Sequence, residues 1–232
     1  MDFLPYIVAS AVGYILGSVP NGYLVAKAHG VDIFEVGSGN PGATNVKRVL
    51  GERFGAKGKR AGNLVFVLDA VKGALAAGWV LIYQHFFSTN GTAGSPLPSE
   101  TILKLALVGV VAAVLGHSFS IFTKFKGGKG VATAAGGLVV LIPLPCLIGG
   151  AIWVISFYAS RYVSLGSILA AVAVPAGSWL QGNPLPLNLV ATALGAFVVF
   201  RHRENIRRLL NGTENRFVKK GAVTGEKEKS NT

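Results

Sequence analysis

Long apolar segments alternate with short polar ones along most of the chain. A helix that crosses a bilayer needs about 20 mainly apolar residues, and the longer apolar segments reach that length. The pattern predicts an all-α integral membrane protein with seven transmembrane helices, the fourth of them short. The predicted helices are Phe3–Ala26, Ala61–Phe86, Thr101–Leu115, Ala132–Ile142, Leu147–Ala159, Ile168–Leu180 and Leu187–Phe200.

Two of these helices carry features that interrupt the apolar pattern. The first ends in Gly17–Leu24, which holds a proline and two glycines. A backbone break there would border a cavity or be a simple proline kink. The second helix carries Asp69 and Lys72, whose three-residue spacing places both on one face. A charged pair inside a membrane helix is either a structural ion pair or part of a site.

Lys and Arg residues are distributed unevenly among the polar segments. Seven lie in Lys27–Arg60, three in Gly116–Gly130, one at Arg161 and nine from Arg201 onward. The segments that hold none are Phe87–Glu100, Pro143–Pro145 and Gln181–Pro186. Because cytoplasmic loops are enriched in Lys and Arg, the alternation predicts an N-terminus outside and a C-terminus in the cytoplasm. The four basic segments then share the cytoplasmic face.

The composition agrees with a membrane protein. The mean hydropathy is +0.52, and 14% of the residues are charged, against about a quarter in soluble domains. Twenty-two Lys and Arg against ten Asp and Glu give a formal charge of +12. Because these charges stand between apolar segments, they favour a basic membrane face, with membrane lipid and no nucleic acid as partner.

The polar stretch Val36–Arg48 combines features that suit an oxyanion. Gly37, Gly39 and Gly42 allow tight turns that expose backbone N–H groups. The side chains that add donors or positive charge are Ser38, Asn40, Thr44, Asn45, Lys47 and Arg48. A phosphate group fits this set best. The glycines also fit the dinucleotide pattern G-x-G-x-x-G, but no βαβ unit surrounds them. An ordinary glycine-rich loop between helices is the alternative.

Two further polar segments lie on the same predicted face. Gly116–Thr133 joins glycines to lysines around Gly127-Gly128-Lys129, without the spacing of a Walker A loop. In Arg201–Glu214, His202 and Asn205 are three residues apart and share a helix face. The histidine suits a general base or an oxyanion donor, or is simply a polar residue at the interface. These loops suit a reaction between a soluble phosphate compound and a lipid-like partner.

Several common chemical patterns are missing from the sequence. It has no G-x-S-x-G serine elbow. Its four histidines do not pair with carboxylates at metal-ligand spacing, so we expect no metal and no cofactor. The single cysteine, Cys146, excludes an internal disulfide and lies in an apolar run, where a buried thiol is expected.

A set of short motifs resembles a known family. They are Gly17-Ser18-Val19-Pro20, Gly37–Asn45, Asp69-Ala70-Val71-Lys72-Gly73, Gly116-His117 with Phe125–Thr133, and Arg201–Ile206 with Gly212-Thr213-Glu214. In this order the chain resembles the PlsY family, the bacterial membrane acyl-phosphate:glycerol-3-phosphate acyltransferases. The likeness runs from Gly17 to about Arg216, where the family often has lysine. Residues 1–216 are expected to form one seven-helix membrane acyltransferase domain. Residues 217–232 are expected to form a basic, disordered cytoplasmic tail.

The resemblance implies a reaction and a location. The acyl group of an acyl phosphate passes to the 1-hydroxyl of sn-glycerol 3-phosphate, giving lysophosphatidic acid and inorganic phosphate, in the first acylation step of phospholipid synthesis. Neither acyl-CoA nor acyl carrier protein is the direct donor, so a functional link to the acyl-phosphate-forming enzyme is implied. The protein is expected in the bacterial cytoplasmic (inner) membrane, with its active site facing the cytoplasm. The His-x4-Asp signature of the other large class of glycerolipid acyltransferases is absent.

The resemblance also implies site residues. His202, Asn205 and Ser38 are expected at the reacting centre. The residues expected to bind substrate or phosphate are Gly37, Gly39, Asn40, Thr44, Asn45, Arg48, Gly127, Gly128, Lys129, Ser164, Ser167 and Arg201. The division between donor phosphate and glycerol 3-phosphate stays open, and either His202 or a substrate phosphate takes the proton. Since acyl phosphate has a good leaving group, we expect direct attack by the glycerol hydroxyl, without a covalent acyl-enzyme.

A transporter or channel for a phosphorylated metabolite is the main alternative. The same basic loops would serve it, and Asp69 and Lys72 favour it. The concentration of the loops on one face and the lack of a visible repeat count against it. A structural membrane scaffold leaves the glycine–lysine loops unexplained.

Overall fold

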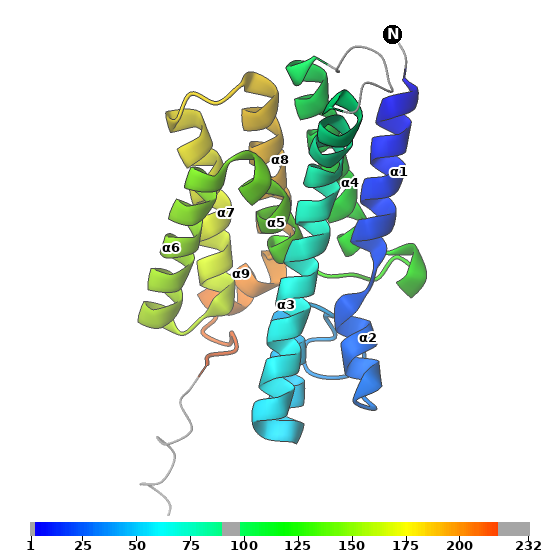
Figure 1. Ribbon diagram of the computed structural model, residues 1–232. Helices are drawn as coiled ribbons and strands as arrows, with labels where there is room; N and C mark the ends of the chain where they lie inside the picture. The colour runs from blue at the N-terminus through cyan, green and yellow to red at the C-terminus, as the bar shows by residue number, and fades with distance from the viewer. Residues whose placement is uncertain (1–2, 90–97, 218–232) are drawn as a thin grey trace, which may run out of the picture.

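The protein is helical in the part that the structure, a computed structural model, describes, residues 3–89 and 98–217 (Figure 1). No strand occurs within these ranges. The helices are α1 (Leu4–Ser18), α2 (Asn21–Ala28), α3 (Ala43–Thr89), α4 (Ser99–Ser118), η1 (Ile121–Thr123), α5 (Val131–Leu141), α6 (Pro143–Ser160), α7 (Val163–Leu180), α8 (Leu185–Arg201) and α9 (Arg203–Leu210).

The long helices pack side by side as a bundle. α1 packs against α4, α3 against α4 and α5, α6 against α7, and α7 against α8. One buried cluster joins Val110 and Val114 of α4, Leu138 of α5, and Leu187 and Leu194 of α8. α2, α9 and the turn within α3 lie at the same end of the bundle, the lower end in Figure 1. That end carries the basic segments of the sequence.

Small residues let the helices approach closely. Gly13 and Gly17 of α1 lie against the backbone of Gly109 and Ala113 of α4, and a methyl group at either glycine would overlap that backbone. Gly136 of α5 lies in the same way against α3. Packing of small residues is a main source of helix association in lipid, where burial of apolar surface contributes little.

The first predicted helix, Phe3–Ala26, is divided in the structure at Val19 and Pro20. Proline lacks the N–H that would continue the helical ladder. The carbonyl of Val19 instead accepts hydrogen bonds from the Asn21 N–H (3.0 Å) and from Lys72 Nζ (2.9 Å). The break borders a polar cavity, which was one of the two outcomes expected from the sequence.

The prediction that Lys27–Arg60 is a loop is wrong in its second half. α3 begins at Ala43 and contains a non-helical residue at Gly55 (φ 59°, ψ −129°), where two helical parts meet. Gly58 and Gly62, which follow this turn, lie against the backbone of the part that precedes it. Residues 43–54 and the start of the long helix therefore form a tight helical hairpin.

The hairpin forms because its apolar residues recur at helical spacing. Val46, Val49 and Leu50 are buried together with Ala61 and Val65. The charged residues between them lie at intermediate or exposed positions, so they do not oppose helix formation. The many positive charges led to the prediction of a loop, although the apolar residues recur every three to four positions, as in a helix.

Several boundaries differ from the prediction by a few residues. Pro143 starts α6 directly after Ile142, so the expected turn Pro143–Pro145 forms the first turn of a helix, where proline is well tolerated. Ser164 and Ser167, expected in an internal turn, lie on the first turns of α7. His117, expected at the end of the third helix, lies in the last turn of α4.

The number of crossings is only partly established. Five helical segments in the described ranges are long and apolar enough to cross a membrane, or six if α8 and α9, bent by 54°, count as one span. α5 is apolar but shorter. The protein is thus a multi-pass membrane protein, while seven crossings and the orientation stay predictions. The predicted external loop Phe87–Glu100 lies largely outside the described residues.

A test of the hairpin is the pair Gly62→Ala and Gly78→Ala. A methyl group at Gly62 would overlap the backbone of Lys47, whereas one at Gly78, on the same helix, meets open space. We expect Gly62→Ala to lower the free energy of unfolding by about 1–3 kcal/mol, as overpacking does. Gly78→Ala should be neutral or slightly stabilising. Thermal unfolding in detergent measures both, and equal effects would contradict the hairpin packing.

Candidate active site

The stretch Val36–Arg48, called the first loop from here on, includes the start of α3. Its shape is fixed by Asn45, which is buried. Its Oδ1 accepts hydrogen bonds from the Ser38 N–H (3.0 Å) and from Arg48 Nη2 (2.8 Å). Its Nδ2 donates to the carbonyl of Val36 (3.2 Å). Gly37 has a φ of 64°, and a side chain there would overlap Oδ1 of Asn45. The amide of Asn45 therefore fixes the loop and aims Arg48.

Other residues of the first loop remain open to a ligand. Ser38 and Thr44 are exposed. Asn40 Oδ1 accepts the N–H of Gly42 (2.8 Å), a local turn contact that leaves the amide nitrogen of Asn40 available in this loop. Gly39, at φ 65°, supplies the second left-handed turn that the glycine pattern predicts.

The second loop, the part of Gly116–Thr133 that lies between α4 and α5, is held through its backbone by residues of α4 and α8. The Gly128 N–H donates to the carbonyl of His117 (3.1 Å). Arg201 Nη2 donates to the carbonyls of Gly127 (3.3 Å) and Gly128 (2.9 Å), and its guanidinium lies 5.2 Å from the ring centre of Phe119. Gly130, at φ 83°, ends the loop and caps α5. Arg201 is thus bound to the loop backbone, so its charge reinforces the loop.

Lys129 and Asn205 bring the second loop to α9. The ammonium of Lys129 donates to Oδ1 of Asn205, and Nδ2 of Asn205 donates to Glu214 Oε1 (2.7 Å). Glu214 also accepts from Ser164 Oγ (2.8 Å) on α7 and from Arg208 Nε (2.7 Å). One carboxylate therefore joins α7, α9 and the second loop.

Glu214 was absent from the predicted site residues, although it belongs to the quoted Gly-Thr-Glu motif. Its signal was weak because it follows a turn glycine beyond the last predicted helix. Burial by itself would raise the pKa of its carboxyl, but the hydrogen bonds from Asn205, Ser164 and Arg208 hold that pKa below its ordinary value. Glu214 is accordingly an anion at neutral pH, which fits its place among cations.

Positive charges surround Lys129. Burial lowers the pKa of its ammonium to about 8. Glu214 acts in the opposite direction, while Arg208, Arg201 and Arg48 lower the pKa further. Because Arg48 belongs to the first loop and Lys129 to the second, the two loops contribute to one electropositive region. An anion placed there would gain from several charges at once.

His202 lies between α8 and α9 and is 3% exposed. Its Nδ1 lies 2.7 Å from the carbonyl oxygen of Val198. A carbonyl can only accept a hydrogen bond, so Nδ1 carries the proton and a neutral ring keeps a free lone pair on Nε2. The arrangement suits proton acceptance at Nε2. His202 and Asn205 are both buried, but His202 lies at the break between α8 and α9 rather than on the helix that carries Asn205.

Ser164 and Ser167 have protein partners. Ser167 Oγ donates to the carbonyl of Val163 (2.9 Å) and accepts from Trp153 Nε1 (3.2 Å). With Ser164 bound to Glu214, both hydroxyls connect helices around the site. Within the described ranges, no group of three or more His, Cys, Asp or Glu side chains could hold a metal ion.

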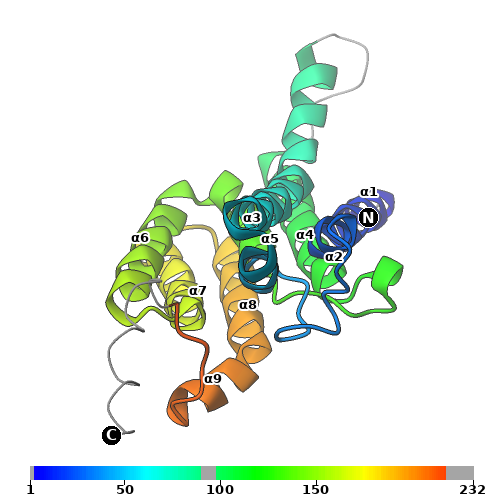
Figure 2. The same ribbon diagram turned by 90° about the horizontal axis from the view of Figure 1, so that it is seen from below.

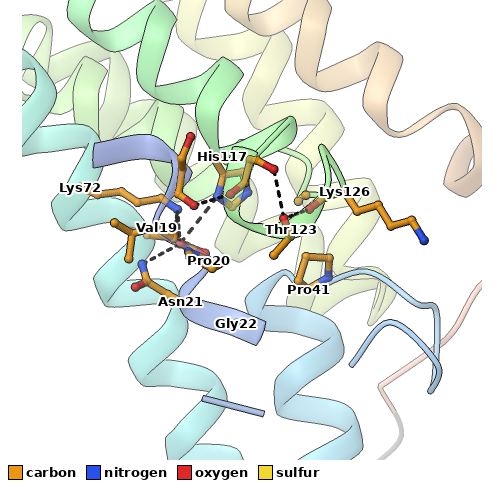
Figure 3. Close-up of a pocket in the computed structure, with 14 residues that line it drawn as sticks. Val19, Pro20, Asn21, Gly22, Pro41, Lys72, His117, Thr123 and Lys126 are labelled. Atoms are coloured by element: carbon orange, nitrogen blue, oxygen red, sulfur yellow. Dashed lines mark hydrogen bonds and ion pairs between the residues drawn. The ribbon is translucent and has the colours of Figure 1, made fainter. Parts of the chain in front are cut away.

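A narrow polar cavity lies behind the second loop (Figure 3). It has a volume of about 10 Å³, room for about one water molecule. Its walls come from the break between α1 and α2, from Pro41, and from Gly127 and Gly128. Asp69, Lys72 and His117 also line it, together with Ser120, Thr123 and Lys126. The sequence motif around Asp69 and Lys72 thus meets the second loop in space.

Comparisons with known proteins agree on one activity. A family model described as glycerol-3-phosphate acyltransferase matches residues 7–212. A glycerol-3-phosphate acyltransferase from Geotalea daltonii is 45% identical over 204 residues, covering 88% of this chain and 93% of the relative. One from Aquifex aeolicus is 41% identical over 204 residues, covering 88% and 95%.

Solved structures are similar as well. The crystal structure of PlsY (YgiH), an integral membrane glycerol 3-phosphate acyltransferase, in its glycerol 3-phosphate form, is 38% identical with a TM-score of 0.77. That match covers 92% of this chain and 96% of the other. The lysophosphatidic acid form gives a TM-score of 0.74 at 38% identity, covering 92% and 95%.

Replacing Glu214 by Ala tests its role as the anchor. The change leaves buried donors on Ser164 and Asn205 without a partner, so we expect a loss of about 1.5–3 kcal/mol in the free energy of unfolding at neutral pH. The exposed Glu204 on the neighbouring α9 is the control, and Glu204→Ala should cost less than about 1 kcal/mol.

The pH dependence of stability gives a second measure of the same anchor. The folded-state pKa of Glu214 is lowered, so its contribution is present above the ordinary carboxyl pKa and is lost as the pH falls through the folded value. Unfolding curves of wild type and Glu214→Ala should therefore converge in acid. A constant difference at all pH values would show that the carboxylate charge plays no part.

Proposed function

The chain belongs to the glycerol-3-phosphate acyltransferase family and is therefore an acyltransferase, and on that premise we propose that its acyl donor is an acyl phosphate. The acyl group passes to the 1-hydroxyl of sn-glycerol 3-phosphate, and the products are lysophosphatidic acid and inorganic phosphate. The observation that carries this proposal is the electropositive region around Lys129, to which both predicted phosphate loops contribute. Family membership also favours acyl transfer over the transport alternative.

Two anionic substrates explain why the site holds so many cations. Glycerol 3-phosphate and an acyl phosphate each bring a phosphate group next to the reacting atoms. Arg48 and Arg208 both act electrostatically on Lys129, and Arg208 also binds Glu214. The site can therefore balance the charge of both phosphates. Ser38, Asn40 and Thr44, with the backbone at Gly37 and Gly39, supply donors from the first loop.

The proposed chemistry is a direct displacement. The hydroxyl oxygen of glycerol 3-phosphate attacks the carbonyl carbon of the acyl phosphate, and a new ester C–O bond forms. The bond between that carbon and the phosphate oxygen breaks, and inorganic phosphate leaves with its electron pair. The hydroxyl proton passes to Nε2 of His202 or to a substrate phosphate. A mixed anhydride needs no covalent acyl-enzyme, so positioning and charge stabilisation suffice.

Hydrogen bonds in the structure support a more specific proposal for several residues. Asn45 acts by fixing the loop and Arg48, and Arg201 acts by holding the carbonyls of Gly127 and Gly128. Asn205 holds Lys129 in place. His202, Lys129, Arg48 and the exposed donors of the first loop then make the direct contacts with substrate.

We further propose that the site faces the cytoplasm of a bacterial inner membrane. Support comes from the Lys and Arg tally and from the position of α2, α9 and the α3 turn at one end of the bundle (Figures 1 and 2). A cytoplasmic site would meet the enzyme that forms the acyl phosphate, the functional partner implied by this donor. Most of the predicted tail 217–232 lies outside the described residues, although Phe217 packs against Phe157.

The donor is tested with purified protein, glycerol 3-phosphate and one of three donors: palmitoyl phosphate, palmitoyl-CoA or palmitoyl carrier protein. We expect phosphate release and lysophosphatidic acid with palmitoyl phosphate, and no product with the other two, because the proposed site accommodates a small phosphate leaving group. If palmitoyl-CoA were the one donor of the three that gave product, the proposed donor would be contradicted. An acylated side chain trapped during turnover would contradict direct attack while leaving the donor intact.

The charge of Lys129 predicts a pH profile. A lysine with a pKa of about 8 is cationic below that pH and neutral above it, so kcat/KM for glycerol 3-phosphate should fall as the pH rises through about 8. Arginine stays charged, and the remaining activity of Lys129→Arg should lack this decline. The same alkaline decline in Lys129→Arg would assign it to another group.

A further inference from the structure

A buried charge cluster, formed by Asn21, Asp69, Lys72 and His117, lies outside the proposed reaction. Asp69 is 3% exposed and Lys72 6%. Oδ1 of Asp69 accepts from Lys72 Nζ (2.9 Å) and from Asn21 Nδ2 (3.0 Å), and Nδ1 of His117 lies 3.7 Å from the same oxygen. Figure 3 shows the side chains of Lys72, Asn21 and His117 converging beside the cavity.

The cluster connects three elements that are distant in sequence. Through Lys72 it holds the carbonyl of Val19 at the break between α1 and α2. Asp69 and Lys72 belong to α3, whose first part carries Asn45 and Arg48. His117 lies in the last turn of α4, which leads into the second loop. The cluster therefore stands where both phosphate loops are attached to the bundle.

His117 contacts the second loop through both its backbone and its ring. Its carbonyl accepts the N–H of Gly128. Its imidazole occupies the space beside Gly128, so that a methyl group added there would overlap Nε2 and the neighbouring ring carbons. Gly128 in turn offers its carbonyl to Arg201 and precedes Lys129. A change in the ring of His117 would thus be transmitted directly to the loop that carries Lys129.

A buried ion pair is a poor source of helix-packing stability. Its desolvation costs free energy that the attraction between the charges offsets only in part, and apolar side chains often stabilise a core more. The polar groups add directional contacts, because Asp69 Oδ1 accepts hydrogen bonds from Lys72 and Asn21 and lies 3.7 Å from Nδ1 of His117. A directional anchor is useful where a loop must be held to within a fraction of an ångström.

We propose that Asp69, Lys72 and His117 are positioning residues that set the place of the second loop, and with it Lys129. They touch neither substrate nor reacting atoms; they act through the imidazole of His117 against Gly128. This inference rests on the proposed role of the second loop in binding a phosphate group. Displacing the loop should weaken binding of a phosphate substrate more than it slows the chemical step.

A double-mutant cycle between His117 and Gly128 tests this. Acyl transfer to glycerol 3-phosphate is measured with the donor that supports wild-type turnover, and KM is determined for each substrate. His117→Ala is expected to raise one KM several-fold. Gly128→Ala should raise the same KM about tenfold in the wild-type background, since its methyl group meets the ring, and less than about twofold once the ring is absent.

The proposal is overturned if the effects of the His117 and Gly128 substitutions are independent of each other. If the two effects multiply, if both KM values stay unchanged, or if only kcat falls, the ring does not position the loop. Should His117→Ala fail to fold, His117→Asn replaces it in the cycle, because its amide nitrogen stands in for Nδ1 while the rest of the ring is removed. An inactive wild type with acyl phosphate would instead count against the proposed donor, so the two failures are distinguishable.

The acidic member is tested by Asp69→Asn, which keeps an oxygen for Asn21 and Lys72 but removes the charge facing His117. We expect the KM that responds in the cycle to rise about threefold or more. The matched controls are Asp32→Asn and His29→Gln, whose side chains bond to backbone within their own segment and should leave both KM values unchanged. An effect of the controls as large as that of Asp69→Asn would also overturn the proposal.

Discussion

The carboxylate of Glu214 is the contact on which the geometry of the site depends. It accepts hydrogen bonds from Ser164, Asn205 and Arg208, and through Asn205 it fixes the ammonium of Lys129. These partners come from two helices and a loop that are far apart in the sequence. Without a charged acceptor, the donors of α7 and α9 would have to be satisfied separately, and Lys129 would lose its orientation.

Glu214 does not neutralise the positive charge of the site. One carboxylate stands among Lys129, Arg208, Arg201 and Arg48, and burial already disfavours the charge on Lys129. A bound phosphate group, as proposed, would offset that repulsion and would itself be stabilised by several cations. Because the cations are preorganised, the proposed displacement would need little rearrangement as negative charge moves to the departing phosphate.

The sequence was sufficient for the apolar helices and for the motifs that converge, because hydrophobic length and local spacing determine both. It was insufficient for the helical hairpin before Gly55, where positive charges concealed the buried Val46 and Leu50. It also missed Glu214 as the anchor. A contact between the end of the chain and Ser164 on α7 depends on how the bundle closes, and no local pattern encodes that.

The central claim is that the two glycine-rich loops form one phosphate site, and a cycle of Arg48→Ala and Lys129→Ala measures it most directly. Each single variant should lower kcat/KM by about 100-fold or more while the protein still folds in detergent, since each removes a charge from a preorganised site. The effects of residues that act as a unit are strongly non-additive. The kcat/KM of the double variant should therefore be close to that of the less active single variant. Losses that multiply would contradict the account, because they would place the two loops at independent sites.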